Sequence, residues 1–308
     1  MMSKTQKRWP WFLVGLAGIL IAAPNATIIR HTTVGADPTL FNILRFGFLS
    51  LALTPYIFLK RRSIRGNALK HSLLVGVFMS IAVTSYVWAI SLSQASYVTI
   101  ITLLSPIIFI CYSVRLNKEK ISHRSIAGIS LAAAGAFTIV ALPILLKQGS
   151  VSQIYPFATV LSLINTLSFP LAIIFSKRAH DAGAPLLATL GVSAWVIFLS
   201  SVITVPLSLG GEEITINHRI LFGALYSAVM VALISRLLGI LVYERLGAVT
   251  SSLLAYLETL IAVILPVLLI KEILSKEMVV GGIFILIGVY VVERHKVPDR
   301  KHIHNHRH

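Results

Sequence analysis

The sequence predicts an all-α integral membrane protein with ten transmembrane helices, built as two inverted five-helix repeats with both termini in the cytoplasm. Four observations support this fold class. Of the 308 residues, 56% are hydrophobic and only 12% are charged, whereas about 25% of the residues in a soluble domain are charged. The apolar residues form stretches of about 17 to 25, the length that crosses a ~30 Å hydrocarbon layer as a helix. Basic residues occupy alternate connections, and one segment recurs in the second half of the chain.

Apolar stretches, bounded by charges and turn residues, define the expected spans in order along the chain. The first span follows a basic segment and with it resembles a signal peptide, but its apolar run is long and many spans follow, so we expect a retained helix. The connections are too short to hold a folded domain outside the membrane. The expected spans are 11–29, 39–59, 71–91, 97–115, 125–145, 154–176, 184–209, 220–243, 248–270 and 277–293.

The distribution of Lys and Arg predicts the orientation of these spans. If the N-terminus is cytoplasmic, 20 of the 27 Lys and Arg residues lie in cytoplasmic segments, 5 lie in outer segments, and Arg45 and Arg236 fall within spans. Basic residues in short connections remain on the cytoplasmic side, so both termini are expected there. The net charge of +16 therefore reflects topology and contact with anionic lipid headgroups, and we expect no binding of nucleic acid.

An internal repeat relates the two halves of the chain. Residues 105–137 match residues 258–290 at an ungapped offset of 153, and the upstream pair Pro24 and Pro38 matches Pro170 and Pro185 with one inserted residue. Each half holds five spans, an odd number, so the second half must enter the membrane from the opposite side. We therefore expect repeats over 1–146 and 147–294, followed by a basic, His-rich tail over 295–308. The coincident positions are Lys118 and Lys271, Glu119 and Glu272, Ser122 and Ser275, Gly128 and Gly281, and Gly135 and Gly288.

These motifs resemble the EamA repeat of the drug/metabolite transporter superfamily. Glu258 and Glu272 match the two acidic positions of that pattern, with Thr259 in place of its usual proline, and Pro106 and Glu119 keep the same spacing in the first half. Arg45-Phe46 is similar to an Arg-Phe pair in the family's second helix. The resemblance implies ten helices and a central cavity lined mainly by the first, third, fourth, sixth, eighth and ninth. Loss of the second-half proline removes the expected cause of a kink in the ninth helix.

Two ionisable side chains at similar depths are the strongest candidates for a binding site. Glu258 lies ~15 Å and Arg236 ~12 Å from the cytoplasmic ends of consecutive antiparallel spans, where charges are costly unless partnered. They either pair in an empty cavity and offer charge to the substrate, or form a purely structural salt bridge. Arg45, near the outer end of its span, is expected to reach the interface as an anchor, with a substrate role as the alternative.

Proline interruptions mark candidate breaks or kinks at Pro24-Asn25, Ser105-Pro106 and Pro170, where freed backbone groups bind solutes in other transporters. Ser105 and Glu258 are equivalent under the repeat and both fall mid-span. Hydroxyl residues in spans also serve as interhelical hydrogen-bond donors, and that structural alternative stays open. The expected substrate-binding residues are Glu258, Arg236, Ser105, Asn25, Tyr86, Trp88, Asn165, Ser168, Tyr256 and Thr84.

We expect a secondary transporter of the bacterial cytoplasmic membrane that moves a small metabolite by alternating access. The family resemblance implies an exporter of amino acids or related compounds; the alternative is an importer of a charged metabolite such as a nucleotide-like cofactor. Coupling to H+ through Glu258 is a further hypothesis, because burial raises a carboxyl pKa. An enzyme or receptor is disfavoured, since no His lies mid-span and no nucleophile with a base is evident.

We accordingly expect no catalytic residue, metal site or cofactor. Gly128, Ala132 and Gly135 place small residues on one helix face, which predicts close helix packing, with a homodimer contact as the alternative. Alternating histidines in the tail either bind a metal or belong to a basic tail beside anionic lipid.

Overall fold

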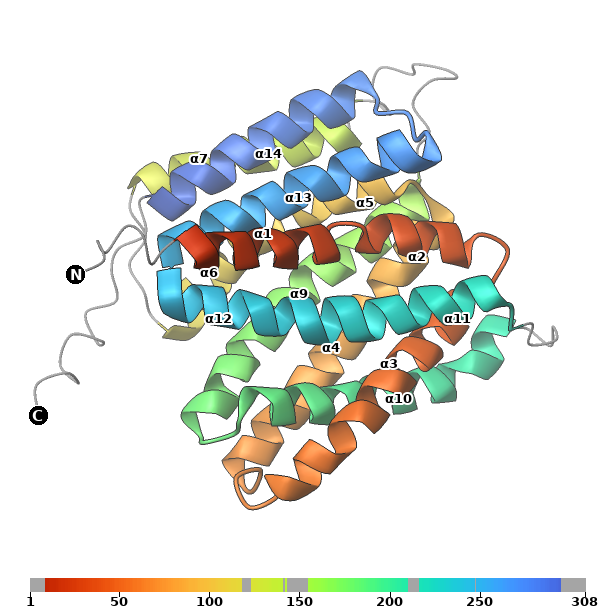
Figure 1. Cartoon of the computed structure of the whole chain (residues 1–308). Coiled ribbons are helices and arrows are strands. Elements are labelled where there is room, and N and C mark those ends of the chain that lie inside the picture. The colour runs from red at the N-terminus through yellow and green to blue at the C-terminus, as the bar shows by residue number, and fades with distance from the viewer. Residues whose placement is uncertain are drawn as a thin grey trace, which may run out of the picture. The chain divides into compact units, whose positions relative to one another are not determined.

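The computed structural model describes residues 9–117, 123–140, 142, 155–209, 216–246 and 248–294, and every regular element within them is a helix (Figure 1). The Lys118-Glu119 motif and the His-rich tail lie outside the described residues. The elements are α1 (Trp9–Ala22), α2 (Asn25–Thr33), α3 (Pro38–Leu59), α4 (Asn67–Leu92), α5 (Ala95–Thr102), α6 (Ser105–Asn117), α7 (His123–Val140), α9 (Pro156–Asp181), α10 (Leu186–Leu209), α11 (His218–Leu225), the π-helix η1 (Tyr226–Ser235), α12 (Arg236–Leu246), α13 (Ala248–Ile270) and α14 (Lys276–Arg294).

The helices have the length and surface of an integral membrane protein. Within the described residues, seven helical segments are long and apolar enough to cross a bilayer, and shorter apolar helices cover Ile126–Val140 and Leu257–Ile270. Large apolar side chains face outwards, and Leu59, Ile203 and Leu268 expose 80%, 74% and 69% of their surfaces. Such a surface is typical of a protein that contacts lipid. The backbone polar groups are hydrogen-bonded within the helices, so apolar side chains face the hydrocarbon. The count of ten spans stays a prediction.

Local sequence explains where several helices begin. The Asp37 carboxylate accepts a hydrogen bond from Leu40 N at 2.9 Å, and Pro38 occupies the first helical position, where a missing N–H costs nothing. Asn217 caps α11 in the same way. The Ser275 hydroxyl accepts from Met278 N at 3.2 Å, so Ser275 is the N-cap of α14.

The structure has helix breaks at two of the three predicted sites, and the helix continues through the third. The first span divides at Ala23 and Pro24 into α1 and α2, and the fourth divides at Leu103 and Leu104 into α5 and α6. Pro170 instead lies inside a continuous α9, because neighbouring helices and local adjustment can satisfy the carbonyl that an internal proline frees. The ninth span, which has Thr259 at the position of Pro106, is a single helix, α13.

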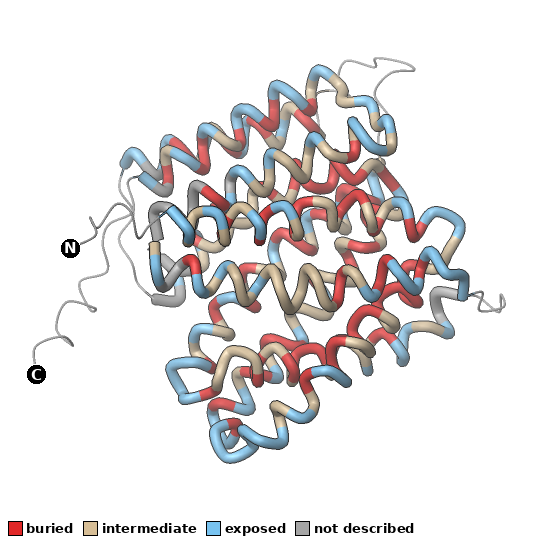
Figure 2. The backbone as a smooth tube through the Cα atoms, viewed as in Figure 1, coloured by how far each residue is buried: buried red, intermediate tan, exposed pale blue. Residues whose placement is uncertain are grey.

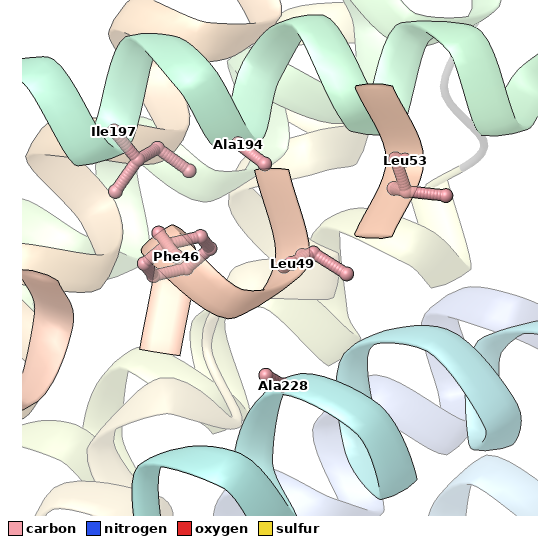
Figure 3. Close-up of a cluster of buried hydrophobic side chains, with 6 residues drawn as sticks. All are labelled: Phe46, Leu49, Leu53, Ala194, Ile197 and Ala228. Atoms are coloured by element: carbon pink, nitrogen blue, oxygen red, sulfur yellow. The ribbon is translucent and has the colours of Figure 1, made fainter. Parts of the chain in front are cut away.

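The helices form two compact units, and each unit takes residues from both halves of the sequence. The first holds Met1–Thr99 and Tyr155–Ile273, and the second holds Ile100–Ile154 and Leu274–His308. In the first unit α4 packs along α9 and α3 packs along α10. A core cluster joins Phe46, Leu49 and Leu53 of α3 to side chains of α10 and η1 (Figure 3). In both units buried residues lie where helices meet, and exposed residues follow the outward faces (Figure 2).

Within the second unit, α7 and α14 meet through reciprocal glycine contacts. A Cβ added to Gly128 would lie 2.7 Å from the Gly288 carbonyl oxygen, and one added to Gly281 would lie 2.5 Å from the Gly135 carbonyl oxygen. The repeat pairs Gly128 with Gly281 and Gly135 with Gly288, so each contact is the repeat-equivalent of the other. Because the early glycine of one helix meets the late glycine of the other, these two equivalent helices are antiparallel.

In the first unit, α3 and α10 are also equivalent under the repeat and also pack against each other in antiparallel orientation. On α3 and α10, the predicted second and seventh spans, Gly47 packs against Phe198 and Gly191 against Leu53. These contacts are also antiparallel, as an inverted repeat requires and as a repeat with parallel halves would not give. The small face of α7 is covered by α14 and is therefore not the contact for a second copy of the chain.

Candidate substrate site

A narrow cavity in the first unit lies between helices from both halves of the sequence. It has about 40 Å³ of enclosed space, enough for water molecules and too little for a metabolite in this conformation. Its walls are mainly apolar, and Arg236 is the charged residue among them. The lining residues are Val75, Met79, Phe169, Ala172, Ile173, Ser176, Leu186, Leu187, Thr189, Leu190, Ser193, Leu233, Arg236, Leu237 and Ile240.

The π-helix η1 sets the position of Arg236, which is the first residue of α12. Three side chains of η1 bond to the broken first span: Tyr226 Oη donates to Ile21 O at 2.7 Å, Ser235 Oγ to Gly18 O at 3.0 Å, and Ser227 Oγ to Asn25 Oδ1 at 2.8 Å. Tyr226 thereby satisfies a carbonyl at the end of α1, which has no partner within the helix. Nothing in the sequence predicted η1, although π-helices are frequent at functional sites.

Arg236 is exposed at the cavity wall. It does not form the predicted ion pair, because no salt bridge joins it to Glu258 within the described residues. Glu258 instead lies within electrostatic range of the Tyr86 hydroxyl. The two interpretations of Arg236 and Glu258 both assumed a direct pair, and in this conformation that assumption is wrong.

Tyr86 joins a second polar cluster in the first unit. Its hydroxyl lies near the Thr99 side chain and within electrostatic range of both Arg45 and Glu258. Arg45 exposes only 8% of its surface, and its guanidinium lies over the Phe46 ring, 5.1 Å from the centroid. The expectation that Arg45 extends to the membrane interface is therefore wrong, because packed helices surround its side chain.

Three predicted binding residues use their polar atoms inside the protein. Asn165 Nδ2 donates to Ala82 O at 2.8 Å, Trp88 Nε1 donates to Thr39 Oγ1 at 3.3 Å, and the Asn25 amide oxygen accepts from Ser227. These bonds favour the structural alternative for Asn165 and Trp88 and leave the Asn25 amide nitrogen free for a ligand.

The remaining predicted residues are not brought to the cavity. Thr84 and Ser168 are half-buried and form no hydrogen bond with the described residues. Ser105 begins α6 and belongs to the second unit. The side chain of Tyr256 lies outside the described residues.

The Glu272 carboxylate holds together the end of the first unit that lies opposite to the cavity. The sequence did not predict a site there. Glu272 accepts hydrogen bonds from Ala95 N at 2.7 Å, Ser96 N at 2.9 Å and Ser96 Oγ at 2.6 Å. It thereby caps the N-terminus of α5, where free N–H groups and the helix dipole favour an anion. The repeated Lys-Glu motif marked this residue, but its partners lie more than 170 positions away.

Further contacts surround this cap, at the ends of α4 and α9 opposite to the cavity. The Arg30 guanidinium donates to the carbonyl oxygens of Ile90 and Ser91 where α4 ends. Tyr97 Oη and Thr159 Oγ1 share a hydrogen bond of 2.6 Å. The bundle is therefore bonded together at one end and hollow at the other. The distribution of Lys and Arg along the sequence predicts that the hollow end faces the cytoplasm, and this orientation stays a prediction.

Two other features bear on possible ligands. A wider groove between α2, α11 and η1, with His31, His218 and Arg219 among its lining residues, is largely apolar and open to the outside of the bundle, which suits a lipid chain. No three His, Cys, Asp or Glu side chains in the described ranges are placed to hold a metal ion.

Comparison with known proteins gives three findings. The pattern of the EamA-like transporter family matches residues 9–141 and again residues 156–294. Protein PecM of Dickeya dadantii (strain 3937) is 26% identical over 199 residues, which are 64% of this chain and 64% of PecM, just under two thirds of that protein's length. A protein of known crystal structure is 16% identical, with a TM-score of 0.56, and the match covers 93% of this chain and 97% of that one. It shares the fold.

Proposed function

The chain belongs to the EamA-like transporter family, and on that premise we propose that it exports an amino acid or a related carboxylate-bearing metabolite from the bacterial cytoplasm. The observation that carries this proposal is Arg236, a lone guanidinium in the wall of an apolar cavity. A guanidinium binds carboxylates through paired hydrogen bonds. Apolar walls of Met79, Phe169 and Leu233 then favour a substrate with an apolar side chain.

Alternating access is supported by the asymmetry of the first unit. The cavity lies towards the beginning of α4 and the end of α9, whereas the bonds of Glu272, Arg30 and Tyr97 lie at their opposite ends. Export would require these bonds to break after substrate enters the cavity and the cavity to close behind it. We further propose that Glu258 carries the coupling proton, since it is a carboxyl group within a span and has no basic partner among the residues that the structure describes.

Transport in proteoliposomes tests the function. Vesicles that contain purified protein are loaded with each of the twenty labelled amino acids, and efflux and uptake are followed with and without a pH gradient. Arg236→Gln should raise KM about 10- to 100-fold for the transported compound, because it removes a hydrogen bond between charged groups worth ~1.5–3 kcal/mol. Arg219→Gln, an exposed control on α11 outside the cavity, should not change KM.

Two results would count against the proposal. Equal KM for the wild type and Arg236→Gln would remove Arg236 from the substrate site. Movement of nucleotide-like anions, but of no amino acid, would favour the alternative of an importer of charged metabolites.

A further inference from the structure

Several buried polar atoms of the first unit have no hydrogen-bond partner among the described residues. Asn42 is completely buried, and neither its amide nitrogen nor its amide oxygen has a hydrogen-bond partner among the described residues. Arg45 Nε and Thr27 Oγ1 are likewise buried and unpartnered. Asn42 and Arg45 are three residues apart on α3, a spacing that puts their side chains on the same helix face.

Leaving these groups unpartnered inside a membrane protein is costly. A buried amide that loses its partners, and a guanidinium inside a span, each oppose folding and insertion. Within the described part of the chain no carboxylate forms a salt bridge with Arg45, and Tyr86 is the neighbour that acts on it electrostatically. Phe46 contributes only the face of its ring. Such strain is usually retained where a ligand relieves it.

The unused atoms define the chemistry of that ligand. Arg45 and the Asn42 Nδ2 group offer donors to a carboxylate, and Asn42 Oδ1 offers an acceptor to an ammonium group. Glu258 lies within electrostatic range of Tyr86, the residue that also acts electrostatically on Arg45. An α-amino acid carries both complementary groups on one carbon, whereas a simple carboxylate would leave the Asn42 oxygen unsatisfied.

We infer that Asn42 and Arg45 form a subsite for the carboxylate and ammonium groups of an α-amino acid, separate from the cavity at Arg236. Arg45 exposes 8% of its surface and Asn42 none, so the subsite is closed in this conformation. It rests on the proposed function, because a transporter needs a second station for its substrate once the Arg236 cavity has closed. An anchoring role for Arg45 at lipid headgroups is not compatible with this burial.

Thermal unfolding of the purified full-length protein in lipid nanodiscs tests the inference. Each L-amino acid is added in turn, and every compound that raises Tm is compared with its α-amide, which lacks the carboxylate, and its N-acetyl form, which lacks the ammonium. At about one hundred times Kd we expect a rise on the order of 5 °C for the amino acid and none for either derivative. Arg45→Gln should abolish the rise.

Asn42→Leu gives an independent signature. It replaces an unsatisfied amide with an apolar group of similar shape, so it should raise the Tm of the ligand-free protein and abolish the rise on adding amino acid. A purely structural Asn42 would instead give a lower Tm. If Arg45→Gln does not fold, Asn42→Leu by itself still tests whether the subsite binds the amino acid.

The outcomes separate the subsite from the transport function. The inference is overturned if no amino acid raises Tm, if the α-amide stabilises as well as the acid, or if Asn42→Leu keeps the full rise. In those cases amino-acid flux that depends on Arg236 would still support the proposed function. If the rise occurs and needs Asn42 and Arg45, but no vesicle assay detects flux, the subsite stands and the transport function falls.

Discussion

Replacing Glu272 with Gln should loosen the bonded end of the first unit. The carboxylate accepts three hydrogen bonds of 2.6 to 2.9 Å at the N-terminus of α5. Gln retains one acceptor oxygen, and its amide group turns a donor towards the remaining donors. A hydrogen bond to a charged group contributes ~1.5–3 kcal/mol, and a charge at the helix terminus contributes ~0.3–1 kcal/mol. Because Glu272 is only half-buried, we expect the substitution to destabilise the closed state of this end by about 2–4 kcal/mol in total.

This loss can be measured as the accessibility of α5. Val98 is fully buried, so a cysteine introduced there in a Cys111→Ser background reacts with a maleimide only when this end opens. A cost of about 2–4 kcal/mol corresponds to a shift in the opening equilibrium of roughly 30- to 1000-fold, and labelling of the Glu272→Gln protein should accelerate at least about tenfold. Detergent solution exposes both ends, so no assumption about orientation enters.

Glu277→Gln is the matched control, because Glu277 lies in the first turn of α14 and accepts none of the three hydrogen bonds that Glu272 accepts from α5. It should leave the labelling rate unchanged. Equal rates for Glu272→Gln and its parent would refute the reasoning, since the three bonds would then contribute nothing to holding this end closed.

Three further predictions concern packing, a buried hydrogen bond and coupling. Gly281→Ala should lower Tm, because its Cβ would lie 2.5 Å from a carbonyl oxygen of the facing helix at a cost of about 1–3 kcal/mol, whereas Gly239→Ala, with open space around it, should not. Tyr97→Phe should cost about 1 kcal/mol through loss of the bond to Thr159, seen as a lower Tm; an unchanged Tm would mean that the bond is not formed. Glu258→Gln should preserve exchange of labelled substrate between equal pools but remove its response to a pH gradient, and a retained response would exclude Glu258 as the coupling group.

The sequence predicted those features whose causes lie within a few residues or in the repeat. Breaks beside Pro24 and Pro106 follow from the missing N–H and fixed φ of proline, and the cap at Ser275 follows from its hydroxyl. The antiparallel meeting of α7 and α14 follows from the odd number of spans in each half. Pro170 shows the limit of this reasoning, because a proline signals a missing hydrogen bond without revealing whether packing maintains the helix around it.

The residues at the candidate sites were harder to predict because their partners are remote in sequence. Depth along a span suggested that Arg45 reaches the interface, but the helices packed around it decide that it does not. Equal depth suggested that Arg236 and Glu258 meet, yet depth leaves the rotation of each helix free. The role of Glu272 depends on the start of α5, and its acidic motif alone could not indicate that partner.

The reciprocal glycines of α7 and α14 bear on the ancestry of the chain. In this contact the first glycine of each helix meets the second glycine of the other helix. A single five-helix protein could make the same contact with a second copy of itself that is inserted in the opposite orientation. In such a pair both copies must carry the same residue at every site. Here Ala132 and Ile285 occupy equivalent positions under the 153-residue offset, and both are completely buried. Fusion of the two copies into one gene permits this difference, so one side can become bulkier while the other stays small.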